Sequence, residues 1–142
     1  MQKVGVLGSA SVGQTLARGF KSHGYDVRIG SRTPAKLADF TASSGIPGGT
    51  FVEARLVKAF NSIGSARMVN PTYAGGRPTM CYCGNDAAAK TLVAKILEEF
   101  GWEAADMGSA VAARAIEPLC QLWCIPGFRQ NHWTHAFRIL WS

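Results

Sequence analysis

The sequence of 142 residues lacks an apolar run of the ~18 residues that a membrane-spanning helix requires. The apolar run near its start, from Val4 to Leu7, is too short for the core of a secretory signal. We therefore expect a cytoplasmic protein, with no membrane partner, whose four cysteines stay reduced. Hydrophobic residues make up 47% and charged residues 17%, with no long polar tract, so a disordered chain is excluded.

The sequence also lacks a run of basic residues, although 15 Lys and Arg against 9 Asp and Glu give a net charge of +6. A positive balance favours an anionic partner. Because the basic residues are scattered, they do not form the arm or patch that is typical of nucleic-acid binding. A phosphorylated cofactor remains the better interpretation, and we do not expect nucleic acid as a partner.

Arrangements typical of nucleophilic or metal-assisted catalysis are missing as well. No Ser-His-Asp or Cys-His set stands at a recognisable spacing, so the catalytic residues are unknown. Cys81 and Cys83 alternate on a predicted strand, and Cys120 and Cys124 share a predicted helix face, but these spacings are not those of a zinc ribbon. We expect no metal site. The segment "NHWTHAF", which contains two of the histidines, is interpreted as a packed or subunit-contact helix.

The first fifty residues predict the order strand, helix, strand, helix, which is the start of a doubly wound α/β unit. The branched run "KVGVLG" is the first strand, and apolar residues at helical spacing follow it. Thr33 and Pro34 are typical of the cap and first position of the second helix. The predicted elements are strand 3–8, helix 11–23, strand 25–30, helix 34–43 and loop 43–50.

The rest of the chain predicts three strands and helices on either side of them. "ARLVKAFN" is interpreted as a third strand that ends near Asn61, and Asp86 as the cap of a long helix. Apolar residues at helical spacing continue to the C-terminus with a break at Pro126-Gly127. The predicted elements are strand 54–61, a helical turn and long loop 62–78, strand 79–85, helix 87–100, strand 102–108 and helices 109–142.

A turn with the glycine spacing of a dinucleotide-binding motif follows the first strand. The first glycine of that motif permits the turn, the second lets the backbone approach a pyrophosphate, and the third allows close helix packing. Gly8 and Gly13 fill the first and third places, and Ala10 fills the second, where its methyl group moves a phosphate slightly outward. The helix N-terminus keeps its free amides for an anion. The alternative is a glycine-rich turn with no ligand.

The residue type after the second strand separates the two nicotinamide cofactors. An acid there binds the free ribose of NAD, whereas an Arg accommodates the 2'-phosphate of NADP. The sequence has Ser31, Arg32 and Thr33 and no acid, so NADP is favoured. Arg32 supplies a planar charged group, and the hydroxyls of Ser31 and Thr33 complete the site. The alternative is a solvated loop arginine.

Several segments, in this order, resemble one known family: "KVGVLGSASVGQTLARGF", "VRIGSRTPAKL", "RLVKAFNSIG", "CGNDAAAK", "ARAIEPLCQLW" and "HWTHAF". They are similar to the NADP-dependent oxidoreductases of the deazaflavin coenzyme F-420 type, whose dinucleotide domain is related to that of pyrroline-5-carboxylate reductases. The resemblance implies a Rossmann domain with a small helical C-terminal extension, and hydride transfer from NADPH to a deazaflavin or flavin acceptor. It places Gly8, Ser9, Ala10, Ser11 and Val12 at the pyrophosphate, and Ser31, Arg32 and Lys36 at the 2'-phosphate.

The chain departs from that family near Ala54-Arg55, where members carry a further strand, helix and strand that hold the nicotinamide half of the cofactor. We therefore expect a truncated Rossmann-like α/β fold with a mostly parallel sheet of about five strands. It forms a single NADP-binding domain, residues 1–142, composed of a nucleotide-binding half (1–50), the remaining strands and helix (55–108) and the C-terminal helices (109–142). The "RLVKAFN" strand then lies beside the first strand or pairs with another chain, which makes a homodimer the expected assembly.

Asn61 is the remaining candidate for cofactor binding. It stands at the carboxyl end of a predicted strand, where open parallel sheets bind ligands. A strand-ending turn residue is an equal alternative. The sequence thus supports an NADP-dependent oxidoreductase whose activity is in doubt, because hydride transfer needs a positioned nicotinamide. A non-catalytic dinucleotide-binding or interaction module is the alternative.

Overall fold

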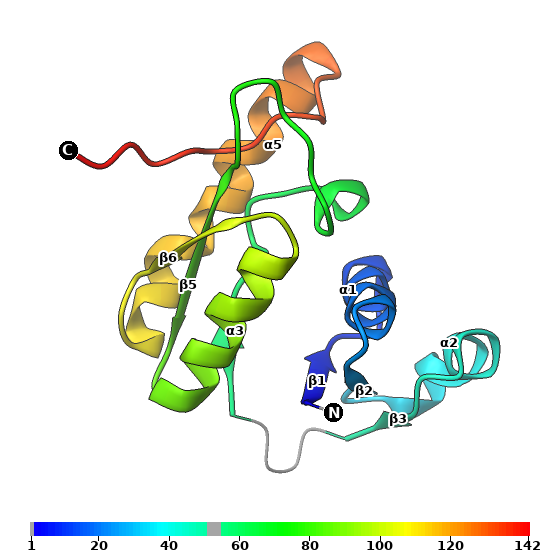
Figure 1. Cartoon of the computed structure of the whole chain (residues 1–142). Coiled ribbons are helices and arrows are strands. Elements are labelled where there is room, and N and C mark those ends of the chain that lie inside the picture. The colour runs from blue at the N-terminus through cyan, green and yellow to red at the C-terminus, as the bar shows by residue number, and fades with distance from the viewer. Residues whose placement is uncertain (1, 51–54) are drawn as a thin grey trace. The chain divides into compact units, whose positions relative to one another are not determined.

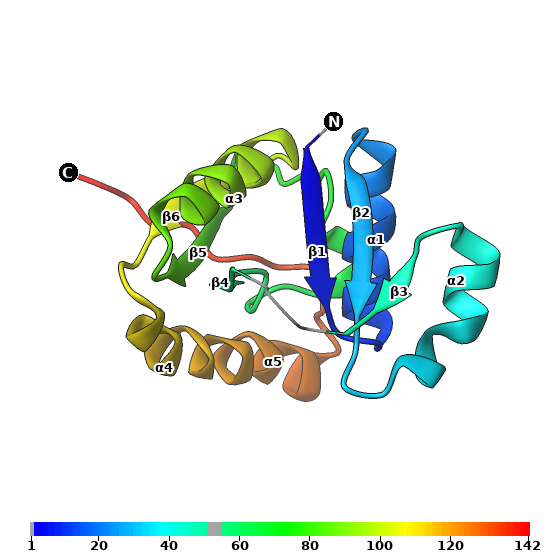
Figure 2. The same cartoon turned by 90° about the horizontal axis from the view of Figure 1, so that it is seen from below.

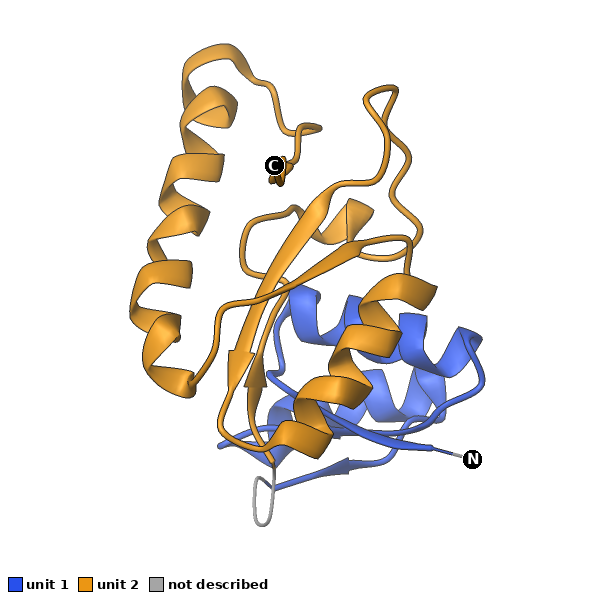
Figure 3. Cartoon of the chain, turned by 60° about the vertical axis from the view of Figure 1, so that its left-hand side comes forward, with its two compact units in different colours: residues 1–54 blue, residues 55–142 orange. Residues whose placement is uncertain are grey.

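The computed structural model describes residues 2–50 and 55–142 (Figure 1). The chain divides into two compact units, residues 1–54 and 55–142, which Figure 3 shows in different colours. Each unit has its own three-stranded sheet. No helix in the part of the chain that the structure describes is long and apolar enough to cross a membrane.

The first unit alternates strands with helices along the chain. Its three strands lie in the order β1-β2-β3, and both pairs are parallel. A short 3-10 helix, η1, leads directly into α2 (Figure 2). The elements are β1 (Lys3–Leu7), α1 (Ser11–Ser22), β2 (Asp26–Gly30), η1 (Pro34–Leu37), α2 (Ala38–Ser44) and β3 (Gly48–Gly49).

The core of this unit lies between α1 and the first two strands. β2 buries Val27 and Ile29 on one face and exposes Asp26 on the other. The helix buries Ala17 and Phe20, which stand about one turn apart and therefore share a face. This packing holds the beginning of α1 against the end of β1.

The second unit places helices on both faces of a mixed sheet. Its strands lie in the order β4-β5-β6, with β4 antiparallel and β6 parallel to β5. α3 covers one face of β5 and β6, and α4 and α5 lie on the other (Figures 1 and 2). The elements are β4 (Val57–Lys58), η2 (Ser65–Arg67), β5 (Thr79–Gly84), α3 (Ala87–Glu99), β6 (Glu103–Asp106), η3 (Ala110–Ala112), α4 (Ala113–Ile116) and α5 (Pro118–Gln130).

Large side chains fill the core of the second unit. Phe100 and Trp102 are almost completely buried, and the indole N–H of Trp102 donates to the Met68 carbonyl at 2.9 Å. A buried indole needs such a partner to avoid a desolvation cost. Asp86 begins α3 as predicted, because its carboxylate accepts from the Ala89 amide at 2.7 Å.

The predicted α/β class with mostly parallel strands is confirmed. The single sheet of about five strands is corrected to two sheets of three strands. The expected loop 43–50 contains β3, because Gly48 and Gly49 pair with the end of β2. The loop composition gave no sign of this two-residue strand, since its pairing partner is the neighbouring strand and not a local pattern.

The predicted third strand, 54–61, differs most from expectation. Ala54 lies outside the described residues. Strand pairing is limited to Val57 and Lys58, which run antiparallel to β5, so within the described residues this segment makes no strand pairing with β1. Phe60 has a φ of 56°, a left-handed conformation that ends the extended segment. Apolar composition predicted the strand but could not select its partner.

The C-terminal helices are also corrected. Pro126 lies inside α5, which continues to Gln130, so the predicted break does not occur there. Residues 131–142 form neither helix nor strand, and His132 and His135 therefore do not share a helix face. The ring of Trp133 packs directly on Gly127, where an added Cβ would lie 2.4 Å from it.

Candidate functional site

The turn after β1 has the backbone geometry that requires glycine at two positions. Gly8 has a φ of +136°, which side chains with a Cβ rarely adopt, and its amide donates to the Gly30 carbonyl at 2.9 Å. At Gly13 an added Cβ would lie 2.4 Å from the Gly8 carbonyl oxygen. The first and third glycines of the motif therefore allow the turn and the close approach of α1 to β1.

The N-terminus of α1 is open to an anion. Ala10 precedes the helix in an extended conformation, makes no side-chain cap, and no acid lies in the first turn. Ser11 and Val12 are exposed at this end. The first helical amides therefore keep unused donors, and the helix dipole adds partial positive charge. The Gln14 side-chain amide donates to the Ser9 carbonyl at 3.0 Å, which links the first turn of α1 to the loop before it.

The loop after β2 is fixed by Ser31 and presents Arg32. Ser31 is buried, its amide donates to the Gly49 carbonyl at 3.1 Å, and its hydroxyl accepts from the Thr33 amide at 3.1 Å. Thr33 was predicted to cap the following helix, but its side chain makes no such hydrogen bond. Arg32 and Lys36 are exposed, so both cationic side chains are accessible to a ligand.

The parallel pairing of β1 and β2 brings the turn and the loop to the same edge of the sheet. Leu7 stands opposite Gly30 in the register, and Gly8, the residue after Leu7, donates its amide to the Gly30 carbonyl. The predicted phosphate residues and Arg32 therefore follow neighbouring strand ends. This is the place where open parallel sheets bind ligands.

Asn61 belongs to the other unit and is engaged there. Its side-chain amide donates to the Ile116 carbonyl at 2.7 Å and to the Glu117 carbonyl at 2.9 Å. These bonds join the segment after β4 to the junction of α4 and α5. They give Asn61 a structural role, and its side-chain oxygen is the part left for a ligand.

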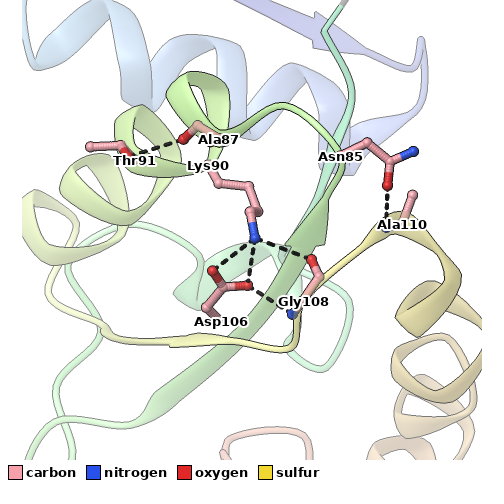
Figure 4. A network of polar contacts seen from close by, with 7 residues as sticks. All are labelled: Asn85, Ala87, Lys90, Thr91, Asp106, Gly108 and Ala110. Atoms are coloured by element: carbon pink, nitrogen blue, oxygen red, sulfur yellow. Dashed lines mark hydrogen bonds and ion pairs between the residues drawn. The ribbon is translucent and has the colours of Figure 1, made fainter.

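A second strand-to-helix turn, between β5 and α3, is occupied by the protein's own side chains (Figure 4). Lys90 reaches both oxygens of Asp106, at 3.2 and 3.0 Å, and the Gly108 carbonyl at 3.3 Å. The hydrogen bond from the Gly108 amide, followed by that from Lys90, lowers the pKa of Asp106. Since Asp86 already caps α3, this turn offers an anion much less than the turn at α1 does.

Three residues of the first site carry roles that the sequence reasoning missed. Gly30 and Gly49 supply carbonyls that fix Gly8 and Ser31, and Gln14 ties down Ser9. Gln14 stands in the first turn of a helix with no capping residue, which is a signal for such a contact. The two glycine carbonyls have no side-chain signal, because the sheet register alone places them.

The remaining candidate groups do not form a metal site of the usual kind. Among the described residues, no three His, Cys, Asp or Glu side chains come together. His135 stacks on Trp123 with 5.1 Å between ring centroids, and both of its ring nitrogens are shielded without a hydrogen-bond partner in this part of the chain. The ring of His135 therefore packs among aromatic side chains, Trp123 and Phe137 among them.

A family model matches residues 3–63, a range that contains the whole turn, the Arg32 loop and Asn61. The family is described as NADP oxidoreductase coenzyme F420-dependent. The matched segment, residues 3–63, is similar to this family. The resemblance stated from the sequence is thereby confirmed over this segment. No curated protein matches the chain.

Several solved structures share the fold of this chain at low sequence identity. A protein from Arthrobacter sp. FB24, described as an F420 dependent NADP-reductase, is 19% identical with a TM-score of 0.71, covering 99% of this chain and 100% of its own. An imine reductase from Bacillus cereus is 12% identical with a TM-score of 0.59, covering 90% of this chain and 61% of its own. An imine reductase from Aspergillus terreus, in complex with NADPH4, is 11% identical with a TM-score of 0.57, covering 92% of this chain and 63% of its own. These likenesses show the Rossmann-like fold.

Proposed function

We propose that this protein binds NADP(H) at the α1 turn and uses it as the hydride donor or acceptor of an oxidoreductase. Gly8, Ser9, Ala10, Ser11, Val12 and Gly13 hold the pyrophosphate, and Ser31, Arg32, Thr33 and Lys36 hold the 2'-phosphate. The observation that carries the proposal is the uncapped, acid-free N-terminus of α1, beside an exposed Arg32. Backbone amides and an Arg side chain are the donors that phosphate groups prefer.

The similarity of residues 3–63 to the F420-dependent family supports the proposed substrate class. The bound NADPH supplies a hydride, and the proposed acceptor is a deazaflavin or a flavin. The chain's own residues then bind and orient the cofactor, because hydride transfer between two ring systems needs positioning more than an acid or base. Asn61 is the candidate residue for the nicotinamide side.

The alternative is a dinucleotide-binding module without turnover. It rests on the proposed loss of a strand, helix and strand at Ala54-Arg55. Two features support that loss: the second unit begins at Arg55, and its first strand pairs antiparallel with β5. Without the missing loops the adenosine half of the cofactor is still held, while the nicotinamide half loses its contacts.

Calorimetric titration with NADPH and NADH tests the binding proposal. Arg32→Ala removes a charge-assisted contact of about 1.5–3 kcal/mol, so NADPH affinity should fall roughly 10- to 100-fold while NADH affinity stays unchanged. Arg28→Ala is the matched control, because it removes the same charge from an exposed position on β2. Equal losses for both cofactors, or no binding of either at millimolar concentration, would contradict the proposed site.

A second assay separates the enzyme from the module. NADPH is mixed with a deazaflavin or flavin, and hydride transfer is followed by the loss of NADPH absorbance. Turnover that Arg32→Ala reduces through a higher KM supports the oxidoreductase. Binding without turnover for either acceptor supports the module.

We also propose that the protein is a cytoplasmic homodimer. β1 has one hydrogen-bonded strand neighbour among the described residues, β2, so its other edge is available for pairing. Light scattering should then give a mass of twice 15.2 kDa. A monomer mass would remove this part of the proposal and leave the cofactor site untouched.

A further inference from the structure

Gln14, in the first turn of α1, binds two consecutive carbonyl groups of the turn that precedes the helix. Its side-chain amide donates to the Ser9 carbonyl at 3.0 Å, and its backbone amide donates to the Ala10 carbonyl at 3.1 Å. The second bond is the ordinary helical one, which any residue at this position makes. The first depends on the side chain, because a carbonyl accepts only from an N–H or O–H group.

These two bonds fix the direction of the next two amide groups. In a planar trans peptide the N–H points away from the C=O of the same unit. The Ser9–Ala10 unit turns its carbonyl to Gln14, so the Ala10 amide points away from Gln14. The Ala10–Ser11 unit does the same for the Ser11 amide. Neither amide donates a hydrogen bond within residues 2–50 and 55–142, so both can bind an anion.

The Ser9–Ala10 peptide lies in the least constrained part of this turn. The residue before it, Gly8, has a φ of +136°, and glycine has the widest conformational freedom in an unfolded or partly folded chain. The hydrogen bond from the Gly8 amide to the Gly30 carbonyl fixes the beginning of the turn, and the helix fixes its end. The Gln14 side chain fixes the peptide between them. Without that hydrogen bond, rotation on either side of the peptide turns the Ala10 amide away from a ligand.

We propose that Gln14 is a positioning residue for the pyrophosphate. It does not contact the ligand; it orients the Ser9–Ala10 peptide so that the Ala10 amide points to a phosphate oxygen. Since the phosphate site is the one proposed above, this role rests on the proposed function. The pyrophosphate is common to NADP and NAD. A change at Gln14 should therefore weaken both cofactors by the same factor, whereas a change at Arg32 weakens NADPH alone.

Calorimetric titration of the full chain with NADPH and NADH tests this role. Gln14→Met keeps the length of the side chain and removes its donor, so the affinity for each cofactor should fall roughly 2- to 10-fold, as expected for one hydrogen bond. Gln14→Glu places a carboxylate, which only accepts, against the Ser9 carbonyl and adds a negative charge near the phosphates, so the loss should be larger. Gln121→Met, at an exposed position on α5, is the matched control and should bind as the parent does.

The amide signals in nuclear magnetic resonance spectra supply a readout that a merely structural role would not move. Saturating NADPH should shift the signals of both the Ala10 and the Ser11 amides in the parent. In Gln14→Met the shift at Ala10 should shrink, because its peptide has lost the side-chain bond. The shift at Ser11 should persist, because its peptide is still bound by the Gln14 backbone. Circular dichroism confirms that each variant folds.

The outcomes separate this role from the cofactor site itself. Equal losses for NADPH and NADH in Gln14→Met, with a reduced shift at Ala10 alone, support the positioning role. Unchanged affinity in folded Gln14→Met, a loss confined to NADPH, or equal reductions at Ala10 and Ser11 would overturn it and leave the proposed function in place. A parent protein that binds neither cofactor would overturn the proposed function and the positioning role together.

Discussion

At the scale of single residues, Gly13 determines how closely α1 can approach β1. An added Cβ would lie 2.4 Å from the Gly8 carbonyl oxygen and 3.0 Å from its carbonyl carbon, which are backbone atoms that cannot move aside alone. The same atoms define the phosphate turn. A change at Gly13 therefore alters stability and cofactor binding together.

Gly13→Ala should destabilise the first unit and weaken NADPH binding. Ala is the better helix former, so the substitution would normally stabilise a helix by up to about 1 kcal/mol. Here overpacking dominates, and we expect a net loss of about 1–3 kcal/mol in the free energy of unfolding, measured by urea denaturation. Gly5→Ala is the control, because an added Cβ there meets nothing within 4 Å. A Gly13→Ala protein as stable as the parent would show that α1 can move away from β1.

The buried ring nitrogens of His135 lower the stability of the protein, and a nonpolar ring at this position would remove that desolvation cost. Both ring nitrogens are shielded without partners in the described part of the chain, and the ring stacks on Trp123. His135→Phe keeps the stacking and removes the unsatisfied nitrogens, so we expect the free energy of unfolding to rise by about 1 kcal/mol. Urea denaturation followed by circular dichroism measures it. His132→Phe, at an exposed position, should change stability little; an equal gain at both positions would refute the explanation.

At the scale of elements, α1 and α3 begin in opposite ways. α3 is capped by the Asp86 carboxylate, whereas Ala10, the residue before α1, supplies no side-chain cap. Capping is worth about 1 kcal/mol to a helix, so the sequence forgoes stability at the start of α1. An end kept free in this way is available to a negatively charged ligand.

Ala10→Asp should therefore stabilise the protein and lower its affinity for NADPH. The new carboxylate caps α1, which raises the free energy of unfolding by about 1 kcal/mol. It also places a negative charge where the pyrophosphate is proposed to lie, so NADPH affinity should fall by roughly tenfold or more. Calorimetry measures binding and urea denaturation measures stability. Ser22→Asp adds the same charge at the other end of α1 and should leave binding unchanged; unchanged binding in Ala10→Asp would move the phosphate away from this turn.

The elements that the sequence predicted well are those with local signals. β1, α1, β2 and the Asp86-capped α3 follow from residue periodicity, glycines and a capping acid. The errors concern which strands pair with each other. Val57 and Lys58 pair antiparallel with β5, and Gly48 and Gly49 extend the first sheet. Pro126 lies inside α5, next to Gly127, on which the ring of the distant Trp133 packs, and a local breaker signal does not include such a contact. The site residues were named from the motif, whereas the carbonyls of Gly30 and Gly49 that fix them follow from strand register.

At the scale of the whole molecule, the sequence predicts one domain and the structure has two compact units, each with its own sheet. The proposed cofactor residues, Asn61 apart, lie in the first unit. All four tryptophans, at positions 102, 123, 133 and 141, lie in the second. Tryptophan fluorescence therefore reports the unfolding of the second unit, while circular dichroism reports both.

This distribution allows the coupling between the units to be measured. NADP⁺ at 100 times its Kd adds about 2.7 kcal/mol to the free energy of unfolding of the unit that contains the binding site. If the two units unfold separately, the urea midpoint followed by tryptophan fluorescence stays in place, and circular dichroism shows a second transition that moves to higher urea. A single transition that shifts equally by both probes would instead establish the one cooperative domain predicted from the sequence. We expect separate transitions, because no strand pairing joins the two sheets within the described residues. Arg32→Ala provides the control, since its 10- to 100-fold weaker binding should cut the stabilisation at the same NADP⁺ concentration from about 2.7 to between about 1.4 and 0.4 kcal/mol, without altering either transition in the absence of ligand.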